Sequence, residues 1–129
     1  MKKLKITFHQ KSFYASLLEK EAPNTIAAIE AICPFKSRVS YAKLADREFF
    51  FQTPAFYDLV ENPTYSQAGD VAFYGSRQCI CIFYDNLTPL GFVNQFASIE
   101  PADLGRLRTE ADTIWEKQGD IIQIEVIDQ

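Results

Sequence analysis

Residues 69–85, with the sequence GDVAFYGSRQCICIFYD, place the strongest constraint on the fold of this chain. Short apolar runs between turn residues predict two β-strands, 71–74 and 78–84, joined across 75–77. Side chains alternate along a strand, and both faces of the second strand are apolar, so both must be covered. A closed barrel with further elements packed outside it would cover them, as would the middle of a sandwich. One face carries Cys79, Cys81 and Phe83, and the other carries Ile80, Ile82 and Tyr84.

Six further strands are predicted from alternation and from apolar runs bounded by turns. Phe49-Phe50-Phe51 is again apolar on both faces. The connection 53–68 is long and contains Pro54 and Pro63, and ordered loops of this length often form part of a site. The connection is therefore a candidate rim. The six strands are expected at 4–8, 13–18, 37–44, 48–52, 92–99 and 121–127.

Two helices are predicted between these strands. The first spans about 23–33, because Pro23 suits a first helical turn and Pro34 ends the helix. The second spans about 102–118, with Gly119 as its C-cap. Eight strands, mostly antiparallel, with two separated helices predict a mainly β fold, a closed eight-stranded barrel capped by the helices.

Composition limits the classes of partner and the cellular location. The chain has 129 residues, enough for one domain with its own core, expected over 1–129. A net charge of −4 argues against a nucleic-acid binder. No apolar run reaches membrane-spanning length, and no secretory signal follows the N-terminal lysines. Three cysteines, an odd number, indicate reduced thiols, so a cytoplasmic protein without a membrane partner is expected.

Several short motifs occur in an order that is similar to one known superfamily. Pro23-Asn24-Thr25 precedes an apolar helix, and Gly69-Asp70-Val71 precedes Gly75-Ser76-Arg77-Gln78 and an apolar strand. Val93 to Ile99 and Ile114-Trp115-Glu116 follow in the same order. Over residues 4–127 the chain resembles the cyclophilin-like superfamily, and within it the small bacterial cyclophilin-like proteins of unknown function. The resemblance implies a barrel, but no particular reaction.

The resemblance also implies where the residues of a prolyl isomerase would fall. The cyclophilin arginine would fall within Tyr41-Ala42-Lys43, where Lys43 is a flexible point charge instead of a planar donor fork. The run Phe49–Gln52 is similar to the run that lines the proline pocket. The cyclophilin histidine would fall near Val93, which cannot replace it. Peptidyl-prolyl cis-trans isomerase activity is therefore kept as an alternative function.

Polar and amphipathic groups on otherwise apolar strands suggest a small-ligand site. Two of them are cations, which favour a carboxylate on the ligand, although solvated cations at a barrel rim would give the same composition. The leading interpretation is a barrel that binds a small carboxylate-bearing ligand or a short peptide. The alternatives are an isomerase and a non-catalytic subunit or assembly protein, and a homo-oligomer is also left open. The candidate ligand-binding residues are Arg38, Tyr41, Lys43, Phe49, Gln52, Tyr84 and Asn94.

Other reactive residue types point to packing. His9 is the one histidine, which excludes a His-rich metal site, and it is interpreted as a solvated surface residue. Cys79 and Cys81 share a strand face and are interpreted as buried core thiols, because two thiolates hold zinc poorly. The isolated glycines form no phosphate-binding loop. No metal or cofactor is therefore expected.

Overall fold

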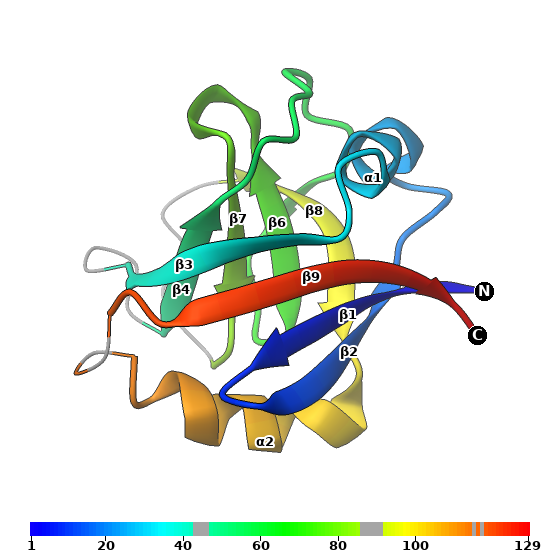
Figure 1. Cartoon of the computed structure of the whole chain (residues 1–129). Coiled ribbons are helices and arrows are strands. Elements are labelled where there is room, and N and C mark those ends of the chain that lie inside the picture. The colour runs from blue at the N-terminus through cyan, green and yellow to red at the C-terminus, as the bar shows by residue number, and fades with distance from the viewer. Residues whose placement is uncertain (43–46, 86–91, 115, 117) are drawn as a thin grey trace.

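The structure, a computed structural model, describes residues 1–42, 47–85, 92–114, 116 and 118–129. Within these residues the chain forms nine strands, two α-helices and one short 3₁₀ turn (Figure 1). In chain order the elements are β1 (Lys2–Phe8), β2 (Lys11–Leu17), α1 (Pro23–Glu30), β3 (Phe35–Tyr41), β4 (Glu48–Gln52), β5 (Pro63–Tyr65), β6 (Asp70–Tyr74), the 3₁₀ turn (Gly75–Arg77), β7 (Cys79–Phe83), β8 (Phe92–Ile99), α2 (Pro101–Ala111) and β9 (Ile121–Asp128).

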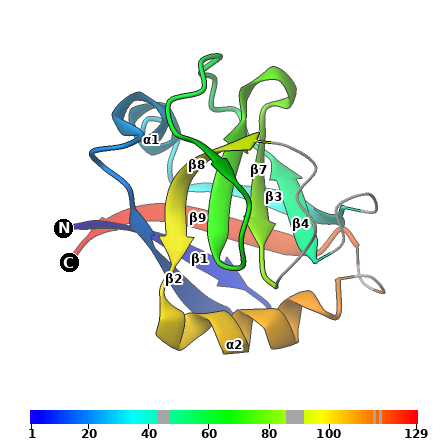
Figure 2. The same ribbon diagram turned by 180° about the vertical axis from the view of Figure 1, so that it is seen from behind.

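Eight of the strands close into a barrel. Their order is β2-β1-β9-β3-β4-β7-β6-β8, and β8 pairs back onto β2. Every strand pairing among the described residues is antiparallel. The remaining strand, β5, pairs with β8 outside this circuit. The two helices lie at opposite ends of the barrel (Figures 1 and 2), so the predicted closed, mainly β barrel with two helices is confirmed.

The strand bounds differ from the prediction where the backbone turns. Gln78 has a left-handed φ of 49°, so β7 begins one residue later, at Cys79. The β1–β2 turn is centred on His9 and Gln10, with φ values of 53° and 65°, which are typical of a two-residue hairpin turn. β5 was not predicted, because its three residues lie inside what reads as a connection.

Both helices are shorter than predicted. α1 ends at Glu30 and α2 at Ala111, and after each of them backbone N–H groups donate to carbonyls three residues back, as in a tightened final turn. Gly119 is therefore not the C-cap of α2; with φ at 97°, it donates its N–H to the Val39 carbonyl at 2.8 Å and leads into β9. Neither described helix is long and apolar enough to span a membrane.

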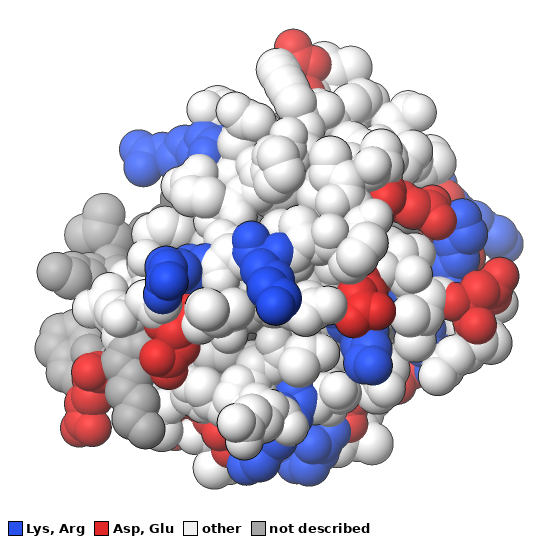
Figure 3. Space-filling model, in the orientation of Figure 1, with Lys and Arg blue, Asp and Glu red and all other residues white. Residues whose placement is uncertain are grey.

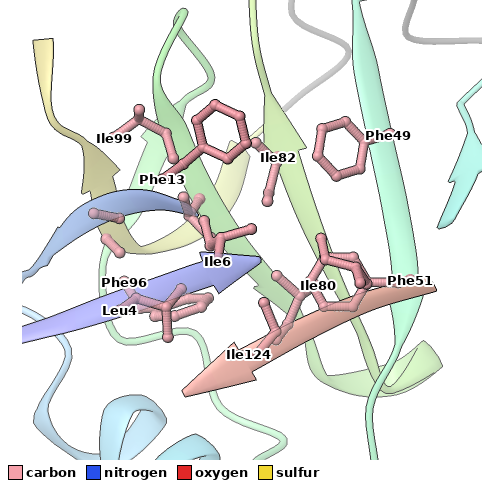
Figure 4. Close-up of a cluster of buried hydrophobic side chains, with 14 of the residues drawn as sticks. Leu4, Ile6, Phe13, Phe49, Phe51, Ile80, Ile82, Phe96, Ile99 and Ile124 are labelled. Atoms are coloured by element: carbon pink, nitrogen blue, oxygen red, sulfur yellow. The ribbon is translucent and has the colours of Figure 1, made fainter. Parts of the chain in front are cut away.

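The barrel interior is filled by apolar side chains from the strands and both helices. Ile80 and Ile82 of β7 are fully buried in this core. The opposite face of β7 is buried in a second apolar cluster that contains Cys79, Cys81 and Phe83. Both faces of β7 are thus covered, as its sequence predicted. Figure 4 shows part of the core and labels Leu4, Ile6, Phe13, Phe49, Phe51, Ile80, Ile82, Phe96, Ile99 and Ile124.

Gly105 offers a stabilising substitution inside α2. A Cβ built on Gly105 would meet no atom within 4 Å, so Gly105→Ala adds no clash. The substitution also reduces the conformational entropy of the unfolded chain. We expect the free energy of unfolding to rise by about 0.5–1 kcal/mol, measured by urea denaturation. Gly119→Ala is the matched control: it also has open space, but its φ of 97° is strained for alanine, so stability should fall. A loss of stability in Gly105→Ala would contradict the open space beside Gly105 in α2.

Candidate functional site

A pocket of about 180 Å³ opens where three segments that are distant in sequence meet. Residues 57–60, from the connection between β4 and β5, form one wall. Residues 73–76, at the end of β6 and the following turn, and residues 92–94, at the start of β8, form the others. These segments lie toward the end of the barrel that also carries α1 (Figure 1).

Large apolar side chains around this pocket are exposed to solvent. Leu59, Val60, Tyr74 and Phe92 line the pocket and are 63%, 63%, 44% and 62% exposed. Tyr65 of β5 stacks on Phe92, with the ring centroids 4.3 Å apart. We call these five residues the apolar rim. Exposed apolar groups gathered in one place commonly mark a binding surface. On the face of the molecule drawn in Figure 3, the upper part carries few charged side chains.

A close backbone contact at Gly75 holds one end of the 57–60 wall. A Cβ on Gly75 would lie 2.2 Å from the Tyr57 carbonyl oxygen and 3.3 Å from the Cα of Asp58. No side chain fits at that distance, so glycine is required for the two backbones to approach. Nearby, the Gln78 side-chain amide donates to the Ala55 carbonyl at 3.3 Å. The sequence indicated Gly75 as a turn residue, but not this packing role.

The carboxylate of Glu61 holds the other end of the wall to the start of α1. It accepts hydrogen bonds from the backbone N–H of Thr25 at 2.6 Å and from its hydroxyl at 2.8 Å. It also accepts from the backbone N–H of Asn24 at 3.2 Å and from its side-chain amide at 3.1 Å. Burial opposes ionisation of Glu61, but the hydrogen bonds from Thr25 and Asn24 together outweigh it and lower its pKa. Glu61 thus supplies the carboxylate that a helix N-terminus favours.

Asn94 connects this carboxylate to the pocket. It lines the pocket and is 4% exposed. Its Oδ1 accepts hydrogen bonds from the backbone N–H groups of Glu61 and Asn62, at 3.2 and 3.1 Å. Its Nδ2 donates to the Thr25 hydroxyl at 3.1 Å. Both ends of the Asn94 amide are therefore used to fix the pocket wall.

The structure brings one of the sequence-derived candidates, Asn94, into the pocket among the residues that it describes. Arg38 is exposed on β3 and donates to the Gly119 carbonyl at 2.8 Å. Tyr41, at the end of β3, is half-buried, and its backbone N–H donates to the Gln118 side chain at 3.3 Å. Lys43 lies outside the described residues.

The other three candidates lie on β4 and at the end of β7. Phe49 is fully buried inside the barrel, with its ring centroid 6.1 Å from that of Tyr84, which is also buried. Gln52 is exposed, and its amide nitrogen can face the carbonyls of Arg77 and Gln78 at 3.0 and 3.1 Å. Phe49 and Gln52 therefore point to opposite sides of the barrel wall, as regular strand alternation requires. The apolar rim was not predicted apart from the choice of 53–68 as a candidate loop.

The comparisons with known proteins agree with this architecture. A family model described as Cyclophilin-like matches residues 2–125, which is nearly the whole chain. The chain belongs to the cyclophilin-like family. No curated protein matches the sequence.

Two solved structures have the same cyclophilin-like fold. One is a structure of McbB in complex with tryptophan, with a TM-score of 0.77 at 16% identity over 95% of this chain. This chain spans 44% of the length of that McbB chain. The other is the solution structure of the hypothetical protein AF2241 from Archaeoglobus fulgidus, with a TM-score of 0.68 at 25% identity. The match covers 95% of this chain and 92% of AF2241.

His9 of this cyclophilin-like barrel is not the solvated residue that the sequence suggested. Its ring stacks on Phe8, with the centroids 3.7 Å apart. Its Nε2 lies 2.7 Å from a carboxylate oxygen of Asp120, and its Nδ1 lies 3.0 Å from one of Glu110. The hydrogen bond that Glu110 accepts from Lys11, and the one that it shares with His9, lower the pKa of Glu110. His9 therefore joins the β1–β2 turn to α2 and to the start of β9, which is a structural role.

A second buried polar cluster lies on the outward face of β4 and β7. Glu48 is 8% exposed, and burial raises its pKa against the opposing effect of a hydrogen bond from Cys81. The hydrogen bond to Cys79 and burial both raise the pKa of Cys81. The described residues form no group of three or more histidine, cysteine or acidic side chains suited to a metal ion. Cys79 and Cys81 are buried beside Ala72 and Phe83, which is the packing role that the sequence predicted for them.

We expect all three thiols to resist alkylation in the native protein. Cys79 and Cys81 are 5% and 4% exposed, so reagents have little access to them, although a hydrogen bond from Cys81 lowers the pKa of Cys79. Burial raises the pKa of the half-buried Cys33 to about 11, which leaves little reactive thiolate at pH 8. Timed iodoacetamide labelling read by mass spectrometry should show slow reaction in buffer and complete reaction in urea. Rapid labelling of Cys81 in buffer would contradict the burial of this face.

Proposed function

We propose that this cyclophilin-like barrel binds a small, largely apolar molecule, or one side chain of a short peptide, in the pocket between residues 57–60, 73–76 and 92–94. The observation that carries the proposal is the apolar rim: five large apolar side chains remain exposed around one hollow. Exposing them to water is unfavourable unless another molecule covers them at some stage. Binding, without any assigned catalysis, is the function that this arrangement supports best.

The size of the pocket limits what it can hold. Ligand sites for drug-sized molecules usually enclose about 300–1,000 Å³. This pocket, at about 180 Å³, is smaller, so it suits one ring system or one side chain. The similarly folded McbB was solved with tryptophan bound, which supports an aromatic ligand of modest size. An indole ring is therefore the first probe to test.

The charge around the pocket bears on whether the ligand carries a carboxylate, as the sequence suggested. Asp58 is the one charged side chain among the described residues that line it. Of the two cations that suggested an anionic ligand, Arg38 lies on β3 and donates to the Gly119 carbonyl, and Lys43 lies outside the described residues. We therefore propose a neutral or cationic ligand, and treat a carboxylate preference as the competing proposal. A contribution of Lys43 to anion binding would appear as a loss of that preference in Lys43→Ala.

Three indole probes test the proposal by ¹⁵N-resolved NMR titration. Indole, tryptamine and indole-3-acetate share a ring and differ in charge, and the amide shifts of residues 57–60, 73–76 and 92–94 report the site. We expect indole and tryptamine to perturb these amides, and Phe92→Ala to weaken their binding by roughly tenfold, about 1.4 kcal/mol. Ile121→Ala is the control, because Ile121 is also 52% exposed and lies on β9. Tighter binding of indole-3-acetate would favour the carboxylate proposal.

The two alternative functions predict different results. A prolyl isomerase would accelerate cis–trans exchange of a proline tetrapeptide, and this activity should be lost in Lys43→Ala. We expect negligible acceleration, because a lysine at 43 cannot orient a planar amide as arginine does. A non-catalytic assembly protein would leave the pocket amides unperturbed by every probe. Either result would replace the binding proposal.

A further inference from the structure

We propose that Glu61, Thr25 and Asn94 are positioning residues for the pocket. Through them the start of α1 sets the ligand affinity, although no described residue of α1 lines the pocket. The inference rests on the proposed function, because it concerns how that pocket is kept in shape. The inference assigns a role to residues that the sequence did not single out as a set. It also predicts that the ligand affinity of the pocket falls at acidic pH.

Residues 57–60, which we call the strap, are held mainly at their ends. At one end the backbone of Tyr57 packs on Gly75, at a distance that excludes any side chain. At the other end the chain passes directly into Glu61, which is bonded to α1. Between these points Asp58, Leu59 and Val60 are all exposed. The position of the strap, and with it the pocket wall, therefore depends on the two end contacts.

The hydrogen bonds around Glu61 form one connected network. Thr25 is fully buried, and its hydroxyl donates to Glu61 while accepting from Asn94. Asn94 in turn accepts from the backbone N–H groups of Glu61 and Asn62. Thr25 and Asn94 are buried, so removing Glu61 or Thr25 leaves at least one buried polar group short of a partner, which costs more than losing a single surface hydrogen bond. Changes at Thr25 and at Glu61 should therefore displace the strap in the same way.

The ionised form of Glu61 is the form that fits this contact. Three of the four donors to its carboxylate are N–H groups, which cannot accept a hydrogen bond, and both donors to Oε2 are of this kind, so a proton on Oε2 would face only donors. The groups that face it from α1 and β8 are Asn24, Thr25 and Asn94, which carry no charge. Asp58 is the other carboxylate on this segment. The network is thus complete above the ordinary titration range of glutamate, and it is lost as the pH falls below that range.

The test compares Glu61→Gln and Thr25→Val with Glu21→Gln, in which an exposed glutamate just before α1 loses the same charge. Without ligand, the amide shifts of 58–60 and 92–94 should move in the first two variants and stay in place in the control. At pH 7, indole should bind to both variants roughly threefold to tenfold more weakly than to the wild type, the loss expected for about one net hydrogen bond. Because the pKa of Glu61 is lowered, the wild-type affinity should hold from pH 7 to the ordinary titration range of glutamate and fall below it, between about pH 4 and pH 3, while that of Glu61→Gln should change little.

Each outcome separates this inference from the proposed function. Unchanged strap amides in both variants, or the same pH dependence in the wild type and Glu61→Gln, would overturn the positioning role. If the strap moves as expected but indole perturbs no wild-type amide, the proposed function fails, while the displaced strap still supports the role of Glu61. Asp58→Asn separates the two carboxylates: a pH dependence that disappears in Asp58→Asn would assign it to Asp58, against this inference.

Discussion

Ile82→Ala is expected to lower the free energy of unfolding by about 2–5 kcal/mol, the usual loss for truncating a fully buried isoleucine. Ile82 is 0% exposed in the barrel core. It lies directly opposite Phe49 of β4 and Val71 of β6, so its side chain is packed between two neighbouring strands. The cavity left by alanine cannot close without moving both neighbours. Urea or guanidinium denaturation followed by circular dichroism would measure the loss.

The matched control for Ile82→Ala is Ile121→Ala. Ile121 is the same residue type, also in a strand, but 52% exposed. Its truncation should change the free energy of unfolding by no more than about 0.5 kcal/mol. A loss of less than about 1 kcal/mol in Ile82→Ala would mean that this face of β7 is not the barrel interior.

Gly75→Ala should both destabilise the protein and close or displace the candidate pocket. The new Cβ would meet the Tyr57 carbonyl oxygen at 2.2 Å, and this atom belongs to the backbone, so no side-chain rotation can relieve the contact. The strap must move away, at an expected cost of about 1–3 kcal/mol in the free energy of unfolding. Denaturation gives this loss, and the amide shifts of 57–60 report the movement.

Ser76→Ala is the control for that substitution. Ser76 is the next residue, lines the same pocket and is exposed, so losing its hydroxyl changes no close backbone contact. Its stability and strap amides should remain close to those of the wild type, and indole binding should persist. If Gly75→Ala bound indole as well as Ser76→Ala does, the strap contact would not define the pocket.

The fold was more predictable than the site, for physical reasons. The two apolar faces of β7 could be predicted from the sequence because strand side chains alternate with a period of two, whatever the neighbouring strands are. β5 gave no such signal, since Pro63–Tyr65 is too short for alternation. The same period assigns Phe49 and Gln52 to opposite faces, which agrees with their observed positions.

The candidate site depends on contacts between residues far apart in sequence, which periodicity does not reveal. Gly75 looks like any turn glycine until Tyr57 is seen beside it. Glu61 looks like a loop carboxylate until its hydrogen bonds to Thr25 are known. Asn94 was selected as a polar group on an apolar strand, and it does line the pocket. Its amide nevertheless also serves to hold the loop, a role that no local pattern indicated.

The seam that closes the barrel has a consequence for how fast the protein folds. β2 meets β8 through three residue pairs, among them Ala15 with Ile99, so chain positions 84 residues apart must come together (99 − 15 = 84). The β1–β2 hairpin can form locally, but its free edge finds a partner only after β8 is in place. Ordering so long a loop costs chain entropy before the seam contributes any stability. Proteins dominated by such non-local pairings fold in roughly milliseconds to seconds, and folding on that timescale is expected for this barrel.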